Sequence, residues 1–115
     1  MARYTCSFIV SVSLERLQQA LSELLQACNF DIIYDTADYM MAREVPGKVP
    51  FAKLVTVEAL IDKTTATAKE VRINFVIKNE ELPLQIDNHC RQMFDIVQRA
   101  VVENRNWQLV ESVPG

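Results

Sequence analysis

The most reactive residue types of the sequence lie in one short tract, residues 87–91, which contains the only histidine of the chain next to a cysteine. Thiol nucleophiles use imidazole as their base, so His89 and Cys90 are the first candidates for chemistry. On a helix, however, adjacent side chains do not face each other. Cys90 also falls on an apolar stripe, where a thiol behaves as a small hydrophobic group. The pattern favours a buried, structural Cys90 and a surface ion pair of Asp87 with Arg91.

Metal and carboxylate sites have less support in the sequence. The three cysteines, His89 and the carboxylates match no zinc-ligand spacing, and no cofactor is expected. Asp31 and Asp35 would share one face of a strand, too far apart to couple closely. Glu80 and Glu81 belong to a loop, where charge usually serves solvation. No catalytic residue is assigned, and the balance favours a protein that is not an enzyme.

Length and composition predict one globular domain over residues 1–115, with 50% hydrophobic and 23% charged residues. The net charge of −3 makes nucleic acid a poor partner, because nucleic-acid binders carry a basic excess. An odd number of distant cysteines indicates reduced thiols rather than a disulfide framework. The start of the chain lacks the pattern of a signal peptide, and no apolar run approaches the ~20 residues that span a bilayer. These features predict a cytoplasmic protein without a membrane partner.

Periodicity predicts the order strand, helix, four strands, helix. Ser13 is the expected N-cap of the first helix, and Asn29 is expected to end it in a left-handed conformation. Which face of residues 39–45 is buried stays open. The strands expected at 51–62 and 69–79 pair best with Glu58 opposite Arg72, since facing opposite charges help. The segments are a strand at 3–12, a helix at 14–28, strands at 30–36, 39–45, 51–62 and 69–79, a helix from Leu84 or Asn88 to about Asn104, and a short strand or tail at 107–110.

This order predicts an α+β fold in which an antiparallel sheet carries both helices on one face, because that arrangement buries every apolar stripe. The element order resembles the TATA-binding-protein-like and helix-grip families over nearly the whole chain. A ferredoxin-like layout, in which residues 107–110 supply the last strand, is the alternative. The tracts Asn79-Glu80-Glu81-Leu82-Pro83 and Asp87-Asn88-His89-Cys90 resemble those of short, uncharacterised cyanobacterial proteins. That resemblance implies a cytoplasmic protein and carries no activity with it.

The polar face of the sheet is the better candidate for function. A sheet covered on one side leaves the other free, and mixed polar and apolar exposure is typical of an interface. An ordinary solvated face is the competing interpretation. The candidate binding residues are Arg43, Glu58, Arg72, Asn74, Lys78 and His89, with Thr56, Leu54, Leu60 and Val76 expected beside them.

Three functions follow from these candidates. The first is a non-enzymatic interaction module that forms a homodimer or binds a protein partner through the outer sheet face. The second is a small enzyme or ligand-binding protein with a pocket between the C-terminal helix and the sheet, near His89 and Cys90. The third is nucleic-acid binding by a dimeric saddle, which the acidic balance and the lack of outward phenylalanine wedges disfavour. The sequence identifies neither the ligand nor the partner.

Overall fold

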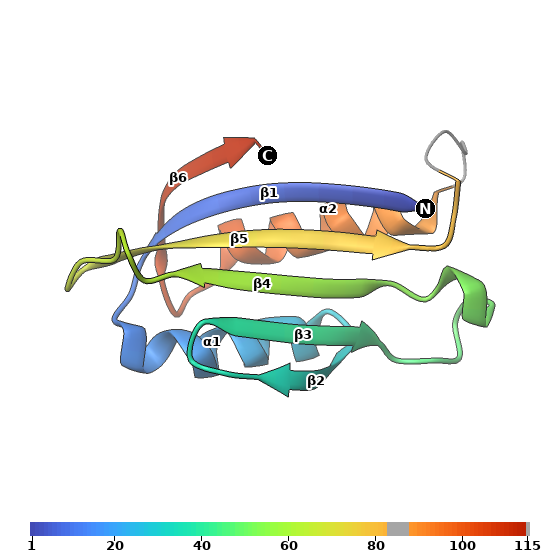
Figure 1. Cartoon of the computed structure of the whole chain (residues 1–115), viewed down its shortest axis with the longest axis horizontal. Helices are drawn as coiled ribbons and strands as arrows, with labels where there is room; N and C mark the ends of the chain where they lie inside the picture. The colour runs from blue at the N-terminus through green and yellow to red at the C-terminus, as the bar shows by residue number, and fades with distance from the viewer. Residues whose placement is uncertain (83–87, 115) are drawn as a thin grey trace.

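The strands form a single antiparallel sheet in the order β2-β3-β4-β5-β1-β6 (Figure 1). The structure is a computed structural model that describes residues 1–82 and 88–114. The predicted α+β class is confirmed, and so is a final strand; the likeness to a named family stays a prediction. The elements are β1 (Ala2–Ser11), α1 (Leu14–Ala27), β2 (Phe30–Asp35), β3 (Tyr39–Glu44), the short 3₁₀ helix η1 (Phe51–Lys53), β4 (Thr56–Asp62), β5 (Glu70–Asn79), α2 (His89–Glu103) and β6 (Gln108–Pro114).

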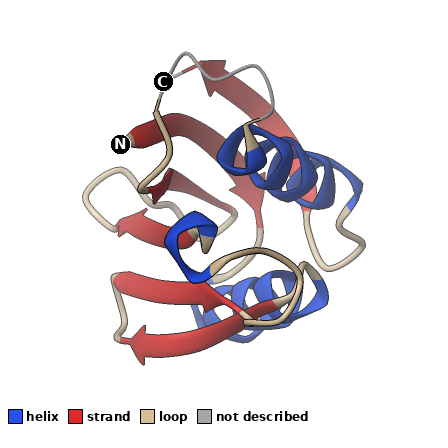
Figure 2. Ribbon diagram, turned by 90° about the vertical axis from the view of Figure 1, so that its right-hand side faces the viewer, coloured by secondary structure: helices blue, strands red, loops and turns tan. Residues whose placement is uncertain are grey.

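Both helices pack on one face of the sheet, and the core lies between the two layers (Figure 2). The period-2 alternation of the strands explains this arrangement, since every second side chain points to the same face. Along β5 the apolar residues of one parity are buried and the opposite parity is partly exposed. The large, fully buried side chains include Phe8, Phe30, Phe75, Leu17, Leu21, Leu25, Met40, Ile73 and Ile77.

The ends of α1 follow the prediction in part. Asn29 adopts a positive φ of 74°, as expected for a residue that ends a helix without glycine. Ser13 is the N-cap residue, as predicted, with an extended backbone, but its hydroxyl makes no cap hydrogen bond. Its carbonyl oxygen instead accepts from the N–H groups of Arg16 and Leu17.

The strand expected at 51–62 is shorter than predicted. Residues Phe51–Lys53 form η1, and the strand begins at Thr56. Pro50 accounts for part of the difference, because proline has no N–H to donate to a ladder. Phe51 projects away from the core and is 80% exposed.

The predicted register of β4 and β5 is also wrong. Glu58 lies opposite Val76, and Arg72 lies opposite Asp62. The connection at residues 63–69 sets this register, because Asp62 accepts hydrogen bonds from the backbone N–H and hydroxyl of Thr64 at 3.0 and 2.6 Å. The turn therefore begins directly after Asp62. Opposite charges still face each other across the pair, through different partners.

A bulge in β2 changes the prediction for its carboxylates. The register of β2 against β3 shifts between Ile32 and Tyr34. Asp31 consequently pairs with Arg43 on the outer side, while Asp35 turns toward α1, where its carboxylate accepts from the Gln18 amide at 2.6 Å. The two carboxylates do not share a face, because the extra residue reverses the alternation.

The start of α2 agrees with one of the two predicted boundaries. The helix begins at His89, and the side chain of Asn88 accepts a hydrogen bond from the backbone N–H of Arg91 as N-cap. The alternative start at Leu84, and Asp87 of the expected ion pair, lie outside the described residues. Within the described part of the chain, neither helix is long and apolar enough to cross a membrane.

A substitution at Asn29 tests the left-handed helix end. We expect Asn29→Val to lower the free energy of unfolding by about 1–2 kcal/mol, because a β-branched residue at positive φ is strained. Asn29→Gly is the matched control and should be as stable as the wild type or more so. Urea unfolding followed by the fluorescence of the buried Trp107 measures both. Equal stability of the valine and glycine variants would contradict this account.

Candidate functional site

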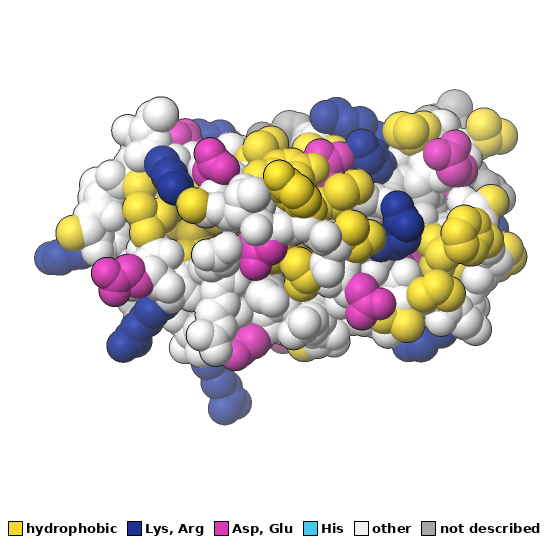
Figure 3. Space-filling model, turned by 60° about the horizontal axis from the view of Figure 1, so that its bottom comes forward, with side chains coloured by type: hydrophobic (Ala, Val, Ile, Leu, Met, Phe, Trp, Pro, Cys, Tyr) yellow, Lys and Arg dark blue, Asp and Glu magenta, His cyan; other side chains and the backbone are white. Residues whose placement is uncertain are grey.

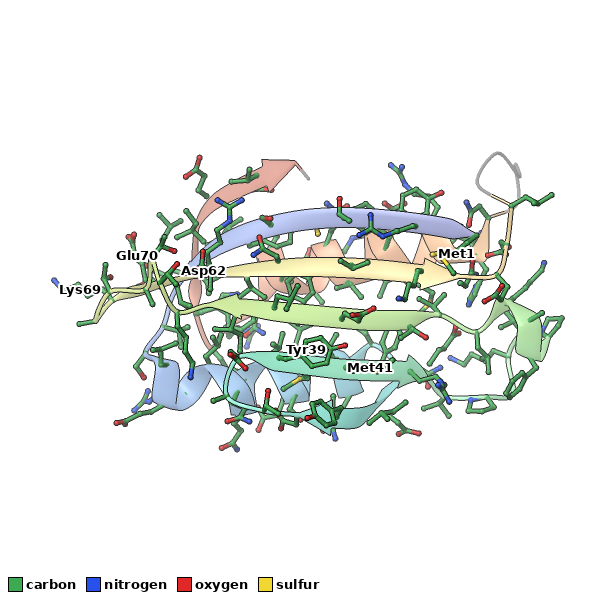
Figure 4. The ribbon with its side chains drawn as sticks, in the orientation of Figure 1. Met1, Tyr39, Met41, Asp62, Lys69 and Glu70 are labelled. Atoms are coloured by element: carbon green, nitrogen blue, oxygen red, sulfur yellow. The ribbon has the colours of Figure 1, made fainter. Side chains whose placement is uncertain are left out.

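The face of the sheet opposite the helices, here called the outer face, is not covered by any described element (Figures 1 and 2). Cross-strand pairing arranges its side chains in rows that run across the strands. The first row places Arg43 beside Thr56, Thr56 beside Lys78, and Lys78 beside Arg3. We call Arg3, Arg43 and Lys78 the basic row. It lies at the end of the sheet where Met1 is found (Figure 4).

The next two rows carry an apolar patch. Met41 and Val76 flank Glu58 in the second row, and Tyr39 pairs with Leu60 in the third. Tyr34 extends the patch onto β2, with its ring 5.8 Å from that of Tyr39 in an edge-to-face contact. Tyr34 is 56% exposed and Leu60 is 44% exposed. The apolar patch comprises Tyr34, Tyr39, Met41, Leu60 and Val76.

The pictures place this patch on the open surface. Figure 4 shows Tyr39 and Met41 on β3 in the middle of the outer face. Figure 3 shows hydrophobic side chains gathered over the β2–β3 side of the sheet, with acidic and basic side chains around them. Contiguous exposed apolar surface of this kind, rimmed by polar groups, marks interaction sites.

Glu58 links the basic row to the apolar patch. Its carboxylate lies 2.7 Å from the Lys78 ammonium and accepts a hydrogen bond from the Tyr39 hydroxyl at 2.9 Å. The bond to Lys78 is the main reason that the pKa of Glu58 lies below its ordinary value; partial burial acts against it and Tyr39 adds to it. The pKa of Tyr39 is raised, first by burial and then by the carboxylate. These contacts fix the orientation of the tyrosine.

The far end of the outer face carries acidic groups. Asp62 lies opposite Arg72, Arg72 lies opposite Ile9, and Ile9 lies opposite Glu111. Glu70 follows one row further along β5. We call Asp62, Glu70 and Glu111 the acidic end; Figure 4 shows the first two at the opposite end from Met1.

The structure brings together most of the predicted binding residues. Glu58, Arg72, Asn74 and Lys78 share the outer face with Arg43. Asn74 is fixed there, since its side-chain oxygen accepts from the Ser7 hydroxyl at 2.6 Å and from Arg72 at 3.2 Å. Leu54 does not lie among them, because it is buried ahead of β4. Tyr39 and Met41 are not among the predicted binding residues, because the alternation of residues 39–45 does not decide which of their faces is buried.

His89 lies apart from this face. Its Nε2 is 2.8 and 2.9 Å from the two carboxylate oxygens of Glu44, and the two side chains are 15% and 1% exposed. Because an ionised carboxylate can only accept, Nε2 carries the donated proton. Glu44 also accepts from the backbone N–H of Val55 at 3.1 Å. The pair ties the start of α2 to β3 and to the segment before β4.

A second buried carboxylate caps α2. Glu81 accepts from the backbone N–H groups of Cys90 and His89 at 2.9 and 3.2 Å, and from the side-chain amide of Asn79. Burial acts to raise the pKa of Glu81, but these hydrogen bonds and the charge of Lys53 outweigh it and leave the pKa below its ordinary value. The carboxylate thus occupies the helix N-terminus, where the helix dipole favours negative charge.

Cys90 is a structural residue in this arrangement, as predicted. It is fully buried, and its thiol lies 3.6 Å from the carbonyl oxygen of Ile77. Burial, with smaller contributions from the charges of Glu81 and Glu44, raises its pKa to about 12. Such a thiol has almost no nucleophilic thiolate near neutral pH.

The sequence interpretation missed the two buried carboxylates. Glu81 was assigned to a solvated loop, which is wrong, since it is 6% exposed. Glu44 carried a usable signal, because it has the same parity in β3 as Met40 and Ala42, both fully buried. A charged residue on that parity predicts a buried partner, and His89 was the available one.

Neither metal-ligand geometry nor comparison with known proteins points to a particular ligand for these sites. Among residues 1–82 and 88–114, no group of three or more histidine, cysteine and carboxylate side chains lies close enough to hold a metal. Surface hollows lie along α1 and beside the β4–β5 turn, away from His89. Comparison of the sequence with models of protein families and with curated proteins finds no match.

Removing His89 tests the pair with Glu44. We expect His89→Ala to lower the free energy of unfolding by about 3–5 kcal/mol, because it leaves a buried carboxylate without its main partner. His89→Ala combined with Glu44→Gln should recover part of this loss, since the amide still accepts from Val55 and no charge is buried. Urea unfolding at neutral pH measures the two single variants, His89→Ala and Glu44→Gln, and the double variant. A combined loss as large as the sum of the two single losses would refute the coupling.

The thiols provide a second test. We expect the native protein to resist an aromatic disulfide reagent at pH 8, because burial raises the pKa of Cys6 and of Cys90 to about 12 and also raises that of Cys28. Labelling should become fast in urea. Mass spectrometry locates the modified residue, and Cys90→Ser serves as the control for its assignment. Rapid labelling of Cys90 in the native protein would restore the reactive alternative.

Proposed function

We propose that the protein is a non-enzymatic interaction module that forms a homodimer through the outer face of its sheet. The apolar patch in the middle rows of this uncovered face is the observation that supports the proposal. A layer with one uncovered apolar surface gains stability by burying it against another layer. A second copy of the chain offers the same surface, as a two-fold symmetric interface requires.

The composition of the face supports this function. Aromatic residues, methionine and arginine are enriched in protein interfaces, and the fully buried centre is depleted in charge. Along the strands, Tyr39 and Met41 lie in the middle rows, whereas Arg3, Arg43 and Arg72 lie in the outer rows; across the strands the patch reaches the edge strand β2 through Tyr34. The order from an apolar centre to a charged rim is the usual anatomy of an interface.

The fixed side chains of the face also favour association. Tyr39 is held by Glu58, and Asn74 is held by Ser7 and Arg72. A surface whose side chains are ordered before binding loses less conformational entropy when a partner arrives.

The other two functions have weaker support. A catalytic or ligand site at His89 and Cys90 would use a thiol of high pKa and an imidazole already bound to Glu44. Nucleic-acid binding would use the basic row, but Glu58 already neutralises Lys78 and the net charge is −3. We place the protein in the cytoplasm, where its unpaired thiols would stay reduced.

A charge placed in the apolar patch tests the dimer. We expect Leu60→Lys to weaken self-association at least about tenfold, because a buried unpaired ammonium opposes the contact. The fold should persist, since Leu60 is 44% exposed in the single chain. Sedimentation equilibrium over a range of protein concentrations measures the dissociation constant of the dimer.

Ile96→Lys is the matched control for this experiment. Ile96 is 47% exposed on α2, on the other side of the molecule, and its substitution should leave the dimer unchanged. Arg72→Glu with Asn74→Glu should also disrupt the dimer, but it removes internal hydrogen bonds and is less selective. A wild type that stays monomeric at every concentration would refute the proposed function.

A further inference from the structure

We infer that two copies pack face to face about a two-fold axis running across the strands, so that the basic row of each copy lies over the acidic end of the other. This inference rests on the proposed self-association and specifies its geometry. It commits to a second copy of the chain as the partner. Charge complementarity between the two ends of the outer face is the evidence that supports it.

The charges of the outer face are separated along the strands. The basic row stands at one end, where Glu58 binds Lys78 and Asp31 of β2 lies opposite Arg43, so cations still outnumber carboxylates there. The acidic end stands three to four rows away. Arg72 lies among its carboxylates, and the exposed Lys63 and Lys69 lie in the connection that adjoins it. A chain with a net charge of −3 therefore presents a locally basic strip on this face.

Two orientations of the two-fold axis in the plane of the interface can be compared. An axis along the strands would place the basic row of one copy over the same row of the other, and like charges placed together are costly. An axis across the strands exchanges the two ends, so the basic row meets the acidic end. The second orientation is the one that the charges favour.

The apolar patch fixes the position of this axis. It occupies the second and third rows, so the axis passes between them. On β3 this places Tyr39 of each copy over Met41 of the other. Methionine sulfur packs favourably against aromatic rings, so the patch is self-complementary about the axis.

The usual angle between the strand directions of two packed sheets then determines which charged residues of the two copies meet. Aligned sheets cross at about −30°. The first and fourth rows lie about 10 Å from the axis, so this rotation moves each row sideways by about 5 Å, close to the ~4.8 Å between strands. We view the first copy as in Figure 1 and place the second copy in front of it. A negative crossing then puts each basic residue of the first copy under the strand of the second copy that lies one place nearer to β6.

That displacement pairs opposite charges. Arg43 of β3 comes over Asp62 on β4 of the second copy, and Arg3 of β1 comes over Glu111 on β6. Lys78 comes over Ile9 rather than over Arg72, so the like-charged contact on β5 is avoided. Each pair occurs twice in the dimer because of the symmetry.

A charge-reversal experiment on Arg3 and Glu111 tests the geometry. Both are exposed, so neither substitution should unfold the chain. We expect Arg3→Glu alone, and Glu111→Lys alone, each to weaken the homodimer at least about tenfold, because two attractive contacts become repulsive. An equimolar mixture of the two variants should form a heterodimer of nearly wild-type affinity, since both pairs are then opposite in charge. Analytical ultracentrifugation with one variant fluorescently labelled measures the three associations.

A mixture of Arg99→Glu with Glu103→Lys is the control, because both residues are exposed on α2. Neither variant should change its own dimer. If Leu60→Lys dissociates the dimer while Arg3→Glu leaves it intact or strengthens it, the geometry is wrong and the proposed function stands. A mixture of Arg3→Glu with Glu111→Lys that fails to associate also overturns the geometry. A monomeric wild type overturns the proposed function itself.

Discussion

Both helices bury their apolar stripes on the same face of one sheet, and the other features of the molecule depend on this constraint. Strand side chains alternate, so a sheet covered on one side must present its second set of side chains to the surroundings. In this chain that second set is not uniformly polar. Tyr34, Tyr39, Met41 and Leu60 lie together on it, and they have no helix to cover them. The uncovered layer is therefore the surface to which our proposal assigns a partner.

The polar interior serves the opposite purpose, which is to attach α2 to the sheet. Glu81 satisfies the first N–H groups of the helix, and Glu44 binds the first helical side chain. Two carboxylates near one helix start would repel each other, but each has its own donors, and no buried side-chain polar atom among the described residues lacks a partner. A site whose donors and acceptors are all used internally supports structure better than catalysis.

Much of this fold could be predicted from the sequence, because periodicity reports directly on burial. The alternation in β5 and the stripe of Cys90, Met93 and Phe94 each predicted the correct buried face. Register was harder, since the Thr64 hydrogen bonds to Asp62 decide it and similar registers differ little in side-chain matching. The bulge in β2 left no signal in the alternation. Glu44 was missed because its partner is distant in the chain.

The same limits explain why the sequence alone located the candidate face but did not predict how its charges are arranged. Five of the six predicted binding residues share the outer face, yet the row order that separates positive from negative charge depends on the register. Arg3 and Lys78 face each other on neighbouring strands and repel in the single chain, although Glu58 lies beside Lys78 and Asp31 lies opposite Arg43. A partner that brings Asp62 and Glu111 over Arg43 and Arg3 relieves this repulsion. In the dimer that we propose, the electrostatic cost of the basic row in the monomer becomes a contribution to stability and orientation.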